Sequence, residues 1–384
     1  QELRLASQSA GPLNWLAGFY YFDEVHDQDR DFSNDECSVC VFPPVFSTDN
    51  VVLEQTRFDR DGWAAFGQVT YSPVDALDLS VGARYSREKI TATQSGTVFV
   101  PAVGPEDTFA GVNSETFSNF SPQASLSYRW NDEVMTYITV SRGYKAGGYD
   151  KYPGTGAAVG IPFDEETSTN YEAGFKASML DRRLTVDGAV FHVDISDMQL
   201  GSTVISPITN LPVGVTTNVG KARSRGAELE VAAMPAEGLM LRGNGAYVDT
   251  TFRRLDSPVG VNEVGGQVPY VPKWTLSGSA EYSHALPVMD GGWEMTWGVF
   301  YRYVGSHETG NGIAPFDSRL AIDSYDVVDA SVSVANDNWD LTVFVNNLTD
   351  SFNVTRRYNP AFQPFNRAEV LPPRQFGARL SYSW

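Results

Sequence analysis

Apolar and polar residues alternate with a period of two along most of the chain. Between Phe120 and Trp130 the even positions are apolar or aromatic, and the odd positions are Ser, Gln or Arg. Residues 77–85 and 293–303 follow largely the same pattern. Because successive side chains of a strand point to opposite faces, each segment predicts a strand with one apolar and one wet face. About fifteen such strands are predicted from end to end, and no segment has convincing helical periodicity.

The connections between these strands alternate between short and long. The short ones, rich in turn-forming residues, are residues 9–12, 73–76, 131–133, 181–182, 235–238, 287–291 and 336–338. The long ones are residues 26–60, 95–115, 148–164, 201–215, 254–270, 306–323 and 351–370. An up-and-down meander puts every other connection on the same rim. The sequence therefore predicts one trimmed and one elaborated rim, as in outer-membrane barrels.

Length, composition and charge restrict the setting of this meander. Of the 384 residues 42% are hydrophobic, but no run approaches the roughly 18 apolar residues of a spanning helix. A membrane span must therefore be a strand. Aromatic residues near the short connections predict the girdle at one membrane surface, and they are Trp15, Tyr71, Trp130, Tyr282, Trp293 and Trp339. The net charge of -19 argues against nucleic acid as a partner, since phosphates would be repelled.

The strand count predicts that the membrane unit extends beyond this sequence. Fifteen strands leave the chain ends on opposite rims, whereas single-chain bacterial barrels have even strand numbers. An open edge would also leave unpaired backbone groups in lipid. We therefore expect an odd number of strands before Gln1 and none after Trp384, which ends on a lipid-facing register.

Five segments resemble the TonB-dependent outer-membrane receptors, specifically the C-terminal part of their barrel, and the resemblance covers essentially the whole chain. The segments are residues 120–128, 141–149, 165–176, 218–230 and the closing stretch, 345–350 with 372–384. The closing stretch, which contains Asn346-Asn347-Leu348-Thr349-Asp350, is the most specific. Its alternating residues Phe376, Leu380, Tyr382 and Trp384 resemble the C-terminal signal for the barrel-assembly machinery, although the usual last residue is Phe.

The resemblance implies an all-β fold, a transmembrane antiparallel up-and-down barrel of 22 strands with a plugged lumen. Residues 1–384 would be its C-terminal portion, about the last fifteen strands, and the plug domain and TonB box would lie outside this sequence. The implied location is the outer membrane of a Gram-negative bacterium. Lipid, lipopolysaccharide and the barrel-assembly machinery would be its partners there, and each barrel would be a monomer.

The function that the resemblance implies is energy-coupled uptake of a scarce, large solute, and no enzymatic activity. TonB with ExbB and ExbD would pull on the plug to admit the solute. The expected cargo is a ferric siderophore, so iron would be part of a transported chelate, and no resident cofactor is expected. Uptake of cobalamin, haem or a saccharide is an alternative within the family. A passive porin and a membrane-embedded hydrolase are alternatives from other classes.

Candidate ligand-binding residues in the last long connection mix cations with aromatic rings. They are Arg356, Arg357, Tyr358, Phe362, Phe365 and Arg367, with Tyr149 and Tyr152 of the third long connection as a second patch. Such a set could hold an anionic, aromatic ferric chelate by charge and stacking. The alternative is a solvated loop whose rings contact lipopolysaccharide or a neighbouring loop.

The two cysteines, Cys37 and Cys40, form a C-x2-C motif in the first long connection. A metal site would need four ligands, and a redox site would need a βαβ context that is missing. A local disulfide between them is favoured, because the cell surface is oxidising.

No catalytic residue and no metal site are predicted. The histidines, His26, His192, His284 and His307, share no spacing with a Ser or Cys that indicates a triad. We expect these four side chains to be lumenal or solvated, with ligand contact at His26 or His307 as the alternative.

Overall fold

The computed structural model describes residues 1–8, 11–34, 50–99, 106–205, 207–208, 212–256, 263–287, 292–309, 320–358 and 367–384. Its main element is one antiparallel sheet of fifteen strands that pair in chain order. These are β1 (Glu2–Ala6), β2 (Leu13–Asn34), β3 (Asn50–Val74), β4 (Leu77–Phe99), β5 (Asp107–Arg129), β6 (Val134–Lys145), β9 (Glu166–Met179), β10 (Leu184–Ser196), β13 (Gly220–Ala236), β14 (Leu239–Leu255), β15 (Trp274–Ala285), β16 (Glu294–Val304), β19 (Tyr325–Ala335), β20 (Trp339–Asn346) and β23 (Gln375–Tyr382). The predicted all-β, up-and-down meander is confirmed.

Smaller elements occupy several of the long connections. Within the described residues they are the hairpins β7 (Gly148–Tyr149) with β8 (Pro162–Phe163), β11 (Gln199–Ile205) with β12 (Pro212–Asn218), β17 (His307–Thr309) with β18 (Leu320–Ile322), and β21 (Val354–Tyr358) with β22 (Arg367–Val370), and the short 3-10 helix η1 (Gly156–Ala158). The sequence indicates only loops here, and local pairing satisfies backbone groups that would otherwise need water. No helix in the described ranges has the length and apolar character needed to cross a membrane.

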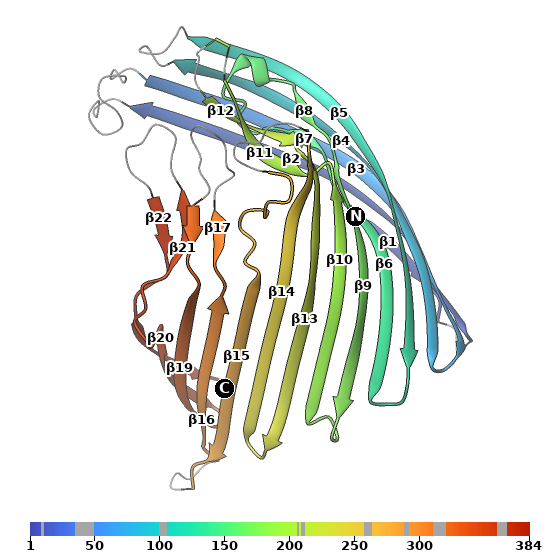
Figure 1. Cartoon of the computed structure of the whole chain (residues 1–384), viewed down its shortest axis with the longest axis vertical. Helices are drawn as coiled ribbons and strands as arrows, with labels where there is room; N and C mark the ends of the chain where they lie inside the picture. The colour runs from blue at the N-terminus through green and yellow to red at the C-terminus, as the bar shows by residue number, and fades with distance from the viewer. Residues whose placement is uncertain are drawn as a thin grey trace.

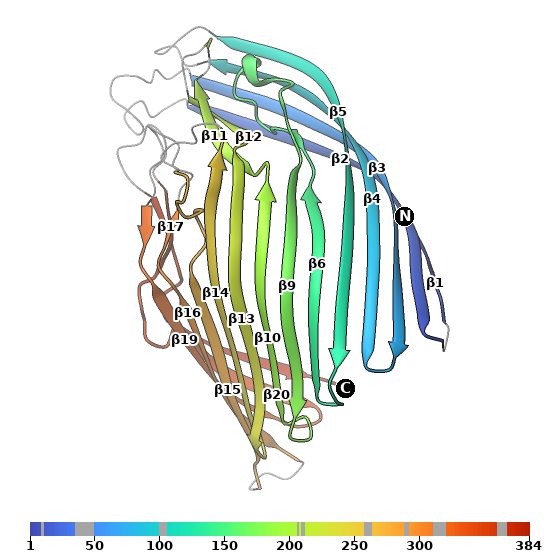
Figure 2. The ribbon, with the colours of Figure 1, turned by 45° about the vertical axis from the view of Figure 1, so that its right-hand side comes forward.

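The sheet curls into an open trough, with β1 and β23 as its two edges (Figures 1 and 2). The short turns lie together at the lower end of Figure 1, which we call the short-turn end. The long connections lie at the opposite, loop end. There β2 to β5 bend over. In Figure 1 β7, β8, β11 and β12 lie inside that bend, and Figure 2 again shows β11 and β12 there.

The register places the apolar positions on the outer face of the trough and the polar positions on its inner face. Leu79, Leu126 and Ile138 are neighbours on three successive strands, and all three are exposed outward. Ser80 and Ser125 pair on the opposite, inner face. A slip of one residue would exchange the two faces, so this alternation specifies the register.

Aromatic residues form two belts on the outer face. The predicted belt lies at the short-turn end, where the rings of Trp339 and Tyr382 are 4.7 Å apart. A second, upper belt that the sequence reasoning missed lies toward the loop end and comprises Phe19, Trp63, Tyr85, Phe120, Tyr171, Tyr247 and Trp274. Trp274 and Tyr282 belong to different belts and are eight residues apart on one strand, about 26 Å at 3.3 Å per residue. At a strand tilt of about 35–45° this corresponds to a height of about 19–22 Å, close to the ~25 Å apolar band of an outer-membrane barrel.

Strands β2 to β5 are longer than the sequence suggests. Residues 26–60 and 95–115 read as loops, yet β2 and β3 pair as far as Asn34 with Asn50, and the β4–β5 pairing reaches Asp107. Beyond the upper belt the outer face no longer contacts lipid. Polar residues such as Asp23 and Asp61 therefore replace apolar ones, and the alternation ends although the strand continues.

Candidate functional site

The segment between β6 and β9, residues 146–164, packs against the inner face of β3 to β5 at the loop end. We call it the docked segment. Its Tyr149 is only 7% exposed and lies in a cluster with Ile90, Ala92 and Phe117. Strands β7 and β8 bring the two ends of the docked segment together, with Gly148 paired with Phe163. A buried aromatic ring thus anchors this connection to the barrel wall.

Three buried polar side chains of the wall bind the backbone of the docked segment. The Glu54 Oε1 accepts a hydrogen bond of 2.6 Å from the Gly154 N–H. Gln94 donates from Nε2 to the Asp150 carbonyl at 2.7 Å. Asp107 Oδ2 accepts from the Thr155 hydroxyl at 2.7 Å and from the Gly156 N–H at 2.9 Å. Because buried polar groups are costly when unpaired, these contacts favour one docked position.

A cation links this network to Tyr152. The Arg30 guanidinium of β2 forms an ion pair with Glu54, whose side chain is fully buried. The same guanidinium lies 4.7 Å from the centroid of the Tyr152 ring, and the Tyr152 hydroxyl donates to the Asp29 carbonyl at 3.3 Å. Tyr152 is half-buried, so contacts hold its ring in place while part of it stays exposed.

The docked segment is also attached to the β11–β12 hairpin. The Asp150 carboxylate accepts from the Thr216 N–H at 2.8 Å, and Gln199 Nε2 donates to the Ala146 and Asp164 carbonyls, each at 2.9 Å. Burial raises the pKa of Asp150 above its ordinary value of 3.8, and the hydrogen bonds from Thr216 oppose that shift. In the docked state this carboxyl therefore keeps its proton to a higher pH than an ordinary aspartate does.

This raised pKa predicts a pH dependence of the contact between the hairpin and the docked segment. Because the pKa of Asp150 is higher in the docked state than in the undocked state, the docked state binds more protons between the two pKa values. The stability of the docked state therefore falls as the pH rises from the undocked to the docked pKa. We expect Thr216 to exchange its amide hydrogen more slowly at a pH near the ordinary aspartate pKa of 3.8 than at pH 7, after correction for intrinsic exchange. Asp150→Asn should remove the dependence. Slower corrected exchange at pH 7 than at acidic pH would contradict this assignment.

A second group of contacts joins three connections at the C-terminal side of the loop end. The buried Thr309 hydroxyl donates to the Arg357 carbonyl at 2.7 Å and accepts from the Arg357 N–H at 3.2 Å. Tyr270 donates its N–H to the Glu308 carbonyl at 2.8 Å. The Arg356 guanidinium lies 5.6 Å from the Tyr270 ring centroid and 3.7 Å from the Glu369 carboxylate. The connections before β15, between β16 and β19, and after β20 therefore form one unit.

The predicted ligand residues differ in exposure, in hydrogen bonding and in the direction of their side chains. Arg356 is exposed, whereas Arg357 donates from Nη1 to the Ala321 carbonyl at 3.2 Å. As neighbours on one strand, these two side chains point to opposite faces, so they do not form one joint cation surface. Tyr149 is packed against the wall and presents little of its ring. The positions Phe362 and Phe365 and the side chains of Tyr358 and Arg367 lie outside the described residues, and the ligand role of the whole set stays a prediction.

The structure also shows where two of the histidines and the C-terminal aromatic and apolar residues lie. His192 and His284 point to the outer face and not into the lumen: His192 Nε2 is 3.2 Å from Asp194 Oδ1, and Trp297 Nε1 donates to His284 Nε2 at 3.3 Å. Phe376, Leu380, Tyr382 and Trp384 lie exposed, the first three on the outer face of the edge strand β23. Cys37 and Cys40 lie outside the described residues, so the disulfide stays a prediction. Among the described residues no cluster of His, Cys, Asp or Glu could hold a metal ion.

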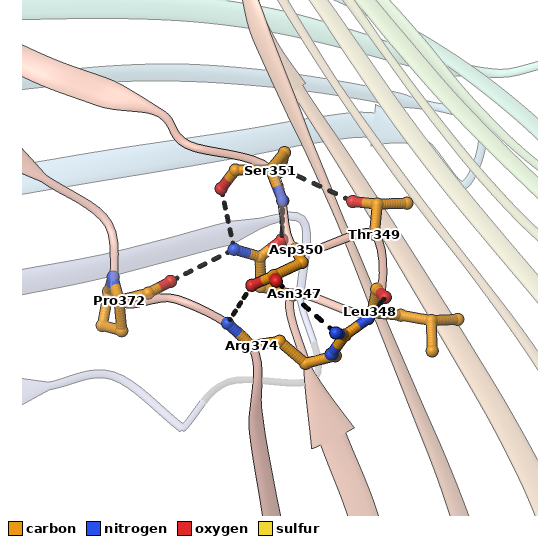
Figure 3. A network of polar contacts seen from close by, with 7 residues as sticks. All are labelled: Asn347, Leu348, Thr349, Asp350, Ser351, Pro372 and Arg374. Carbon is orange, nitrogen blue, oxygen red and sulfur yellow. Dashed lines mark hydrogen bonds and ion pairs between the residues drawn. The ribbon is translucent and has the colours of Figure 1, made fainter.

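The two halves of the closing motif meet at the end of β20 (Figure 3). Asn347 Nδ2 donates to the carbonyls of Ser351 and Pro372, at 2.9 and 3.2 Å. Arg374 donates its N–H to Asp350 Oδ1 at 3.0 Å and its Nη1 to the Leu348 carbonyl at 3.3 Å. We call this network the closing latch. It fixes the chain where it leaves β20 and where it returns to enter β23.

This chain belongs to the TonB-dependent receptor family: residues 3–348 match the family described as TonB dependent receptor-like, beta-barrel. The family consists of transport receptors of the Gram-negative outer membrane and not of enzymes, in agreement with the two-belted outer face and polar inner face. The expectations for family, fold class, location and absence of enzymatic activity are confirmed by this match.

Two curated relatives illustrate the similarity in sequence. The pesticin receptor of Yersinia enterocolitica is 27% identical over 362 residues, which cover 93% of this chain and 47% of that protein. The metal-pseudopaline receptor CntO of Pseudomonas aeruginosa is 30% identical over 241 residues, covering 62% of this chain and 30% of that protein. The chain thus spans about half the length of the pesticin receptor that it matches.

Solved structures show the same fold. The ferric yersiniabactin uptake receptor FyuA from Yersinia pestis superposes with a TM-score of 0.79 at 22% identity, covering 99% of this chain and 53% of that one. The siderophore receptor PiuA from Acinetobacter baumannii gives a TM-score of 0.67 at 16% identity, covering 98% of this chain and 54% of that one. At such identities the likeness defines the architecture of the barrel wall.

Proposed function

We propose that the receptor containing this barrel segment imports a ferric siderophore across the outer membrane in a TonB-driven step. The observation that carries the proposal is the family match, together with relatives named for ferric yersiniabactin uptake and for a metal-pseudopaline complex. Iron is then part of the cargo. A metal chelate is favoured over cobalamin, haem or a saccharide because these relatives are receptors for metal-binding small molecules.

An anionic chelate can bind favourably at the loop end only next to positively charged side chains. The whole chain carries a net charge of -19, so most of its surface repels an anion. Arg356 with the Tyr270 ring, and Arg30 with the Tyr152 ring, combine a cation with an aromatic face at the loop end. Such pairs provide both charge and stacking for a planar anionic ligand. We propose these two pairs as the ligand-contacting positions of the described wall.

In the proposed transport cycle the barrel stays rigid, and the plug domain and the cargo move. TonB with ExbB and ExbD supplies force to a plug domain inside the barrel, and the cargo passes once the plug yields. The docked segment and the three joined connections give the loop end two preorganised walls. Preorganisation limits the conformational entropy that binding would otherwise cost.

Uptake of radioactive iron by cells under iron limitation tests the proposed function. A strain whose full-length receptor gene is deleted should lose uptake of at least one ferric siderophore, and the gene on a plasmid should restore it. Restored uptake that persists in a strain without TonB would contradict energy coupling. Diffusion of small sugars through the purified protein at a porin-like rate would contradict its assignment as a receptor and would favour a passive porin.

The cations predicted for the last long connection, of which Arg356 belongs to a proposed pair, are tested by Arg356→Ala, Arg357→Ala and Arg367→Ala combined in one variant. We expect the dissociation constant for the ferric siderophore to rise about tenfold or more, since a hydrogen bond to a charged group contributes about 1.5–3 kcal/mol. Calorimetric titration of the purified receptor measures this. A matched control, Arg57→Ala with Arg87→Ala and Lys89→Ala, removes three cations from the outer face of the same end. Equal affinity in both variants would contradict an anionic-chelate site at the last connection.

A further inference from the structure

Three successive outward-facing positions of β13 are cations: Lys221, Arg223 and Arg225. Arg225 pairs with His192 on one side and with Asp249 on the other, and the same face of β13 continues downward through Ala227 to Leu229. Leu229 is 49% exposed and belongs to the apolar outer face. Because alternate residues of a strand share a face, the three cations also point outward and not into the lumen. We call them the basic strip.

The basic strip begins where the apolar outer face ends. Ala227 is opposite Tyr247, whose ring lies 4.9 Å from Trp274 in the upper aromatic belt. Aromatic belts mark the level of lipid headgroups. Arg225 is therefore the first outward position beyond that level, and Lys221 lies about 13 Å further along the strand at 3.3 Å per residue.

Carboxylates of the protein neutralise little of this strip. Arg225 shares one carboxylate, Asp249, with Lys273, at 3.3 and 3.7 Å. Asp194 is opposite Arg223 in the register but contacts His192 instead. In the described part of the chain neither Lys221 nor Arg223 has a carboxylate within 4.0 Å. The strip therefore carries a surplus of positive charge on a chain that is strongly acidic overall.

The corresponding height on β2 and β3 has the opposite character. There Asp23 and Asp61 face each other on the outer side, and Arg57 already contacts both Asp27 and Asp59. The positive surplus of β13 is thus not a general property of the zone above the upper belt, because β2 and β3 are acidic at that height.

We propose that the basic strip binds the phosphate groups of the glycolipid in the outer leaflet. A guanidinium offers a fork of donors that matches a phosphate, and an ammonium adds a point charge. Lipid headgroups with such phosphates meet the barrel at the height where the strip begins. Each cation near an anionic membrane surface contributes binding on the order of 1 kcal/mol. The strip then anchors lipid to one sector of the barrel wall, whatever cargo the receptor carries.

Native mass spectrometry of the purified full-length receptor tests this, with lipid A that carries both phosphates as the probe. We expect the receptor to bind this lipid at least tenfold more tightly than the same lipid stripped of phosphate. This comparison needs no substitution, so it remains informative if a variant fails to fold. Equal binding of the two lipids would overturn the proposal.

The variant Lys221→Gln with Arg223→Gln and Arg225→Gln should lose the preference for the phosphorylated lipid. The control Arg57→Gln with Arg87→Gln and Lys89→Gln removes the same charge at a similar height and should retain it. Equal loss in both variants would reveal a general charge effect and would overturn the assignment to β13. Complete competition by inorganic phosphate at about 0.01 M, where salt screening is still weak, would identify a free-anion site and would also overturn it.

Discussion

Gly147→Ala is expected to release the docked segment from the barrel wall. A Cβ at this position would overlap the Phe117 ring and the Phe163 carbonyl oxygen, and a backbone oxygen cannot rotate away as a flexible side chain could. Overpacking of this kind costs about 1–3 kcal/mol. We expect the amide hydrogens of Gly154 and Gly156 to exchange about tenfold faster or more, because each N–H donates to a carboxylate of the wall.

Gly143→Ala provides the matched control, since it adds the same methyl group four residues earlier on β6. A Cβ there would meet only the Ser168 hydroxyl oxygen at 3.6 Å, which is ordinary van der Waals contact. Exchange at Gly154 and Gly156 should stay at the wild-type rate in this variant. If both variants behaved alike, the close approach at Gly147 would not be what holds the segment.

Release of the docked segment should also weaken cargo binding, in proportion to the fraction of molecules in which the segment is released. Tyr152 keeps its position over Arg30 only while the segment stays docked. When only a fraction of molecules has the binding-competent wall, the apparent dissociation constant rises by the inverse of that fraction. Calorimetric titration of Gly147→Ala would test the ligand role of Tyr152 without removing its ring.

The meander was predictable because lipid imposes a simple rule on every spanning strand. Along β5, Leu126 must face lipid and Ser125 must face the lumen, so the period of two is visible in the sequence. The short turns are equally visible, because residues such as Asn131 provide turn geometry by bonding the N–H groups of Glu133 and Val134.

The site at the loop end could not be predicted in the same way. Glu54 and Asp107 read as loop residues, because both faces of their strands are wet and the alternation is lost there. Their roles depend on a segment about fifty to one hundred residues distant in the chain. Tyr149 illustrates the ambiguity of an aromatic residue in a connection, because the same composition fits a ligand contact or a buried anchor. The fold buries its ring against the wall, and its ligand role stays a prediction.

The closing motif lies between these two cases. Its resemblance to the family identified residues 346–350 as a specific element, but the sequence gives no sign that Asp350 would bind Arg374 across the last connection. Asn347 and Asp350 both adopt left-handed backbone angles, with φ of 51° and 54°, which Asn and Asp tolerate better than most residues. Local backbone geometry and long-range hydrogen bonding therefore both favour these residue types.

Asn347→Ala is expected to destabilise the C-terminal edge of the sheet. The Asn347 side chain is buried, with the residue only 4% exposed, and its amide accepts from the Ser351 N–H at 3.0 Å while donating to Pro372. Alanine would remove the hydrogen bonds of this buried side chain, leave the half-buried Ser351 N–H without its partner and keep the left-handed backbone angle. Loss of a polar partner costs about 1–3 kcal/mol and the lost hydrogen bond to Pro372 adds about 1 kcal/mol, so we expect the free energy of unfolding to fall by about 2–4 kcal/mol. Guanidinium unfolding of the full-length receptor in lipid vesicles measures this.

Two further variants separate the causes of that loss. Asn347→Gly removes the same hydrogen bonds but accepts the positive φ, so it should be more stable than Asn347→Ala by about 1 kcal/mol. Thr349→Ala removes only a long contact of 3.5 Å to the Ser351 hydroxyl on an exposed residue and should unfold like the wild type. If Asn347→Ala also unfolded at the wild-type concentration of guanidinium, the hydrogen bonds of Asn347 would contribute no net stability. The latch would then have to depend on Arg374, which binds both Asp350 and the Leu348 carbonyl between the end of β20 and the start of β23.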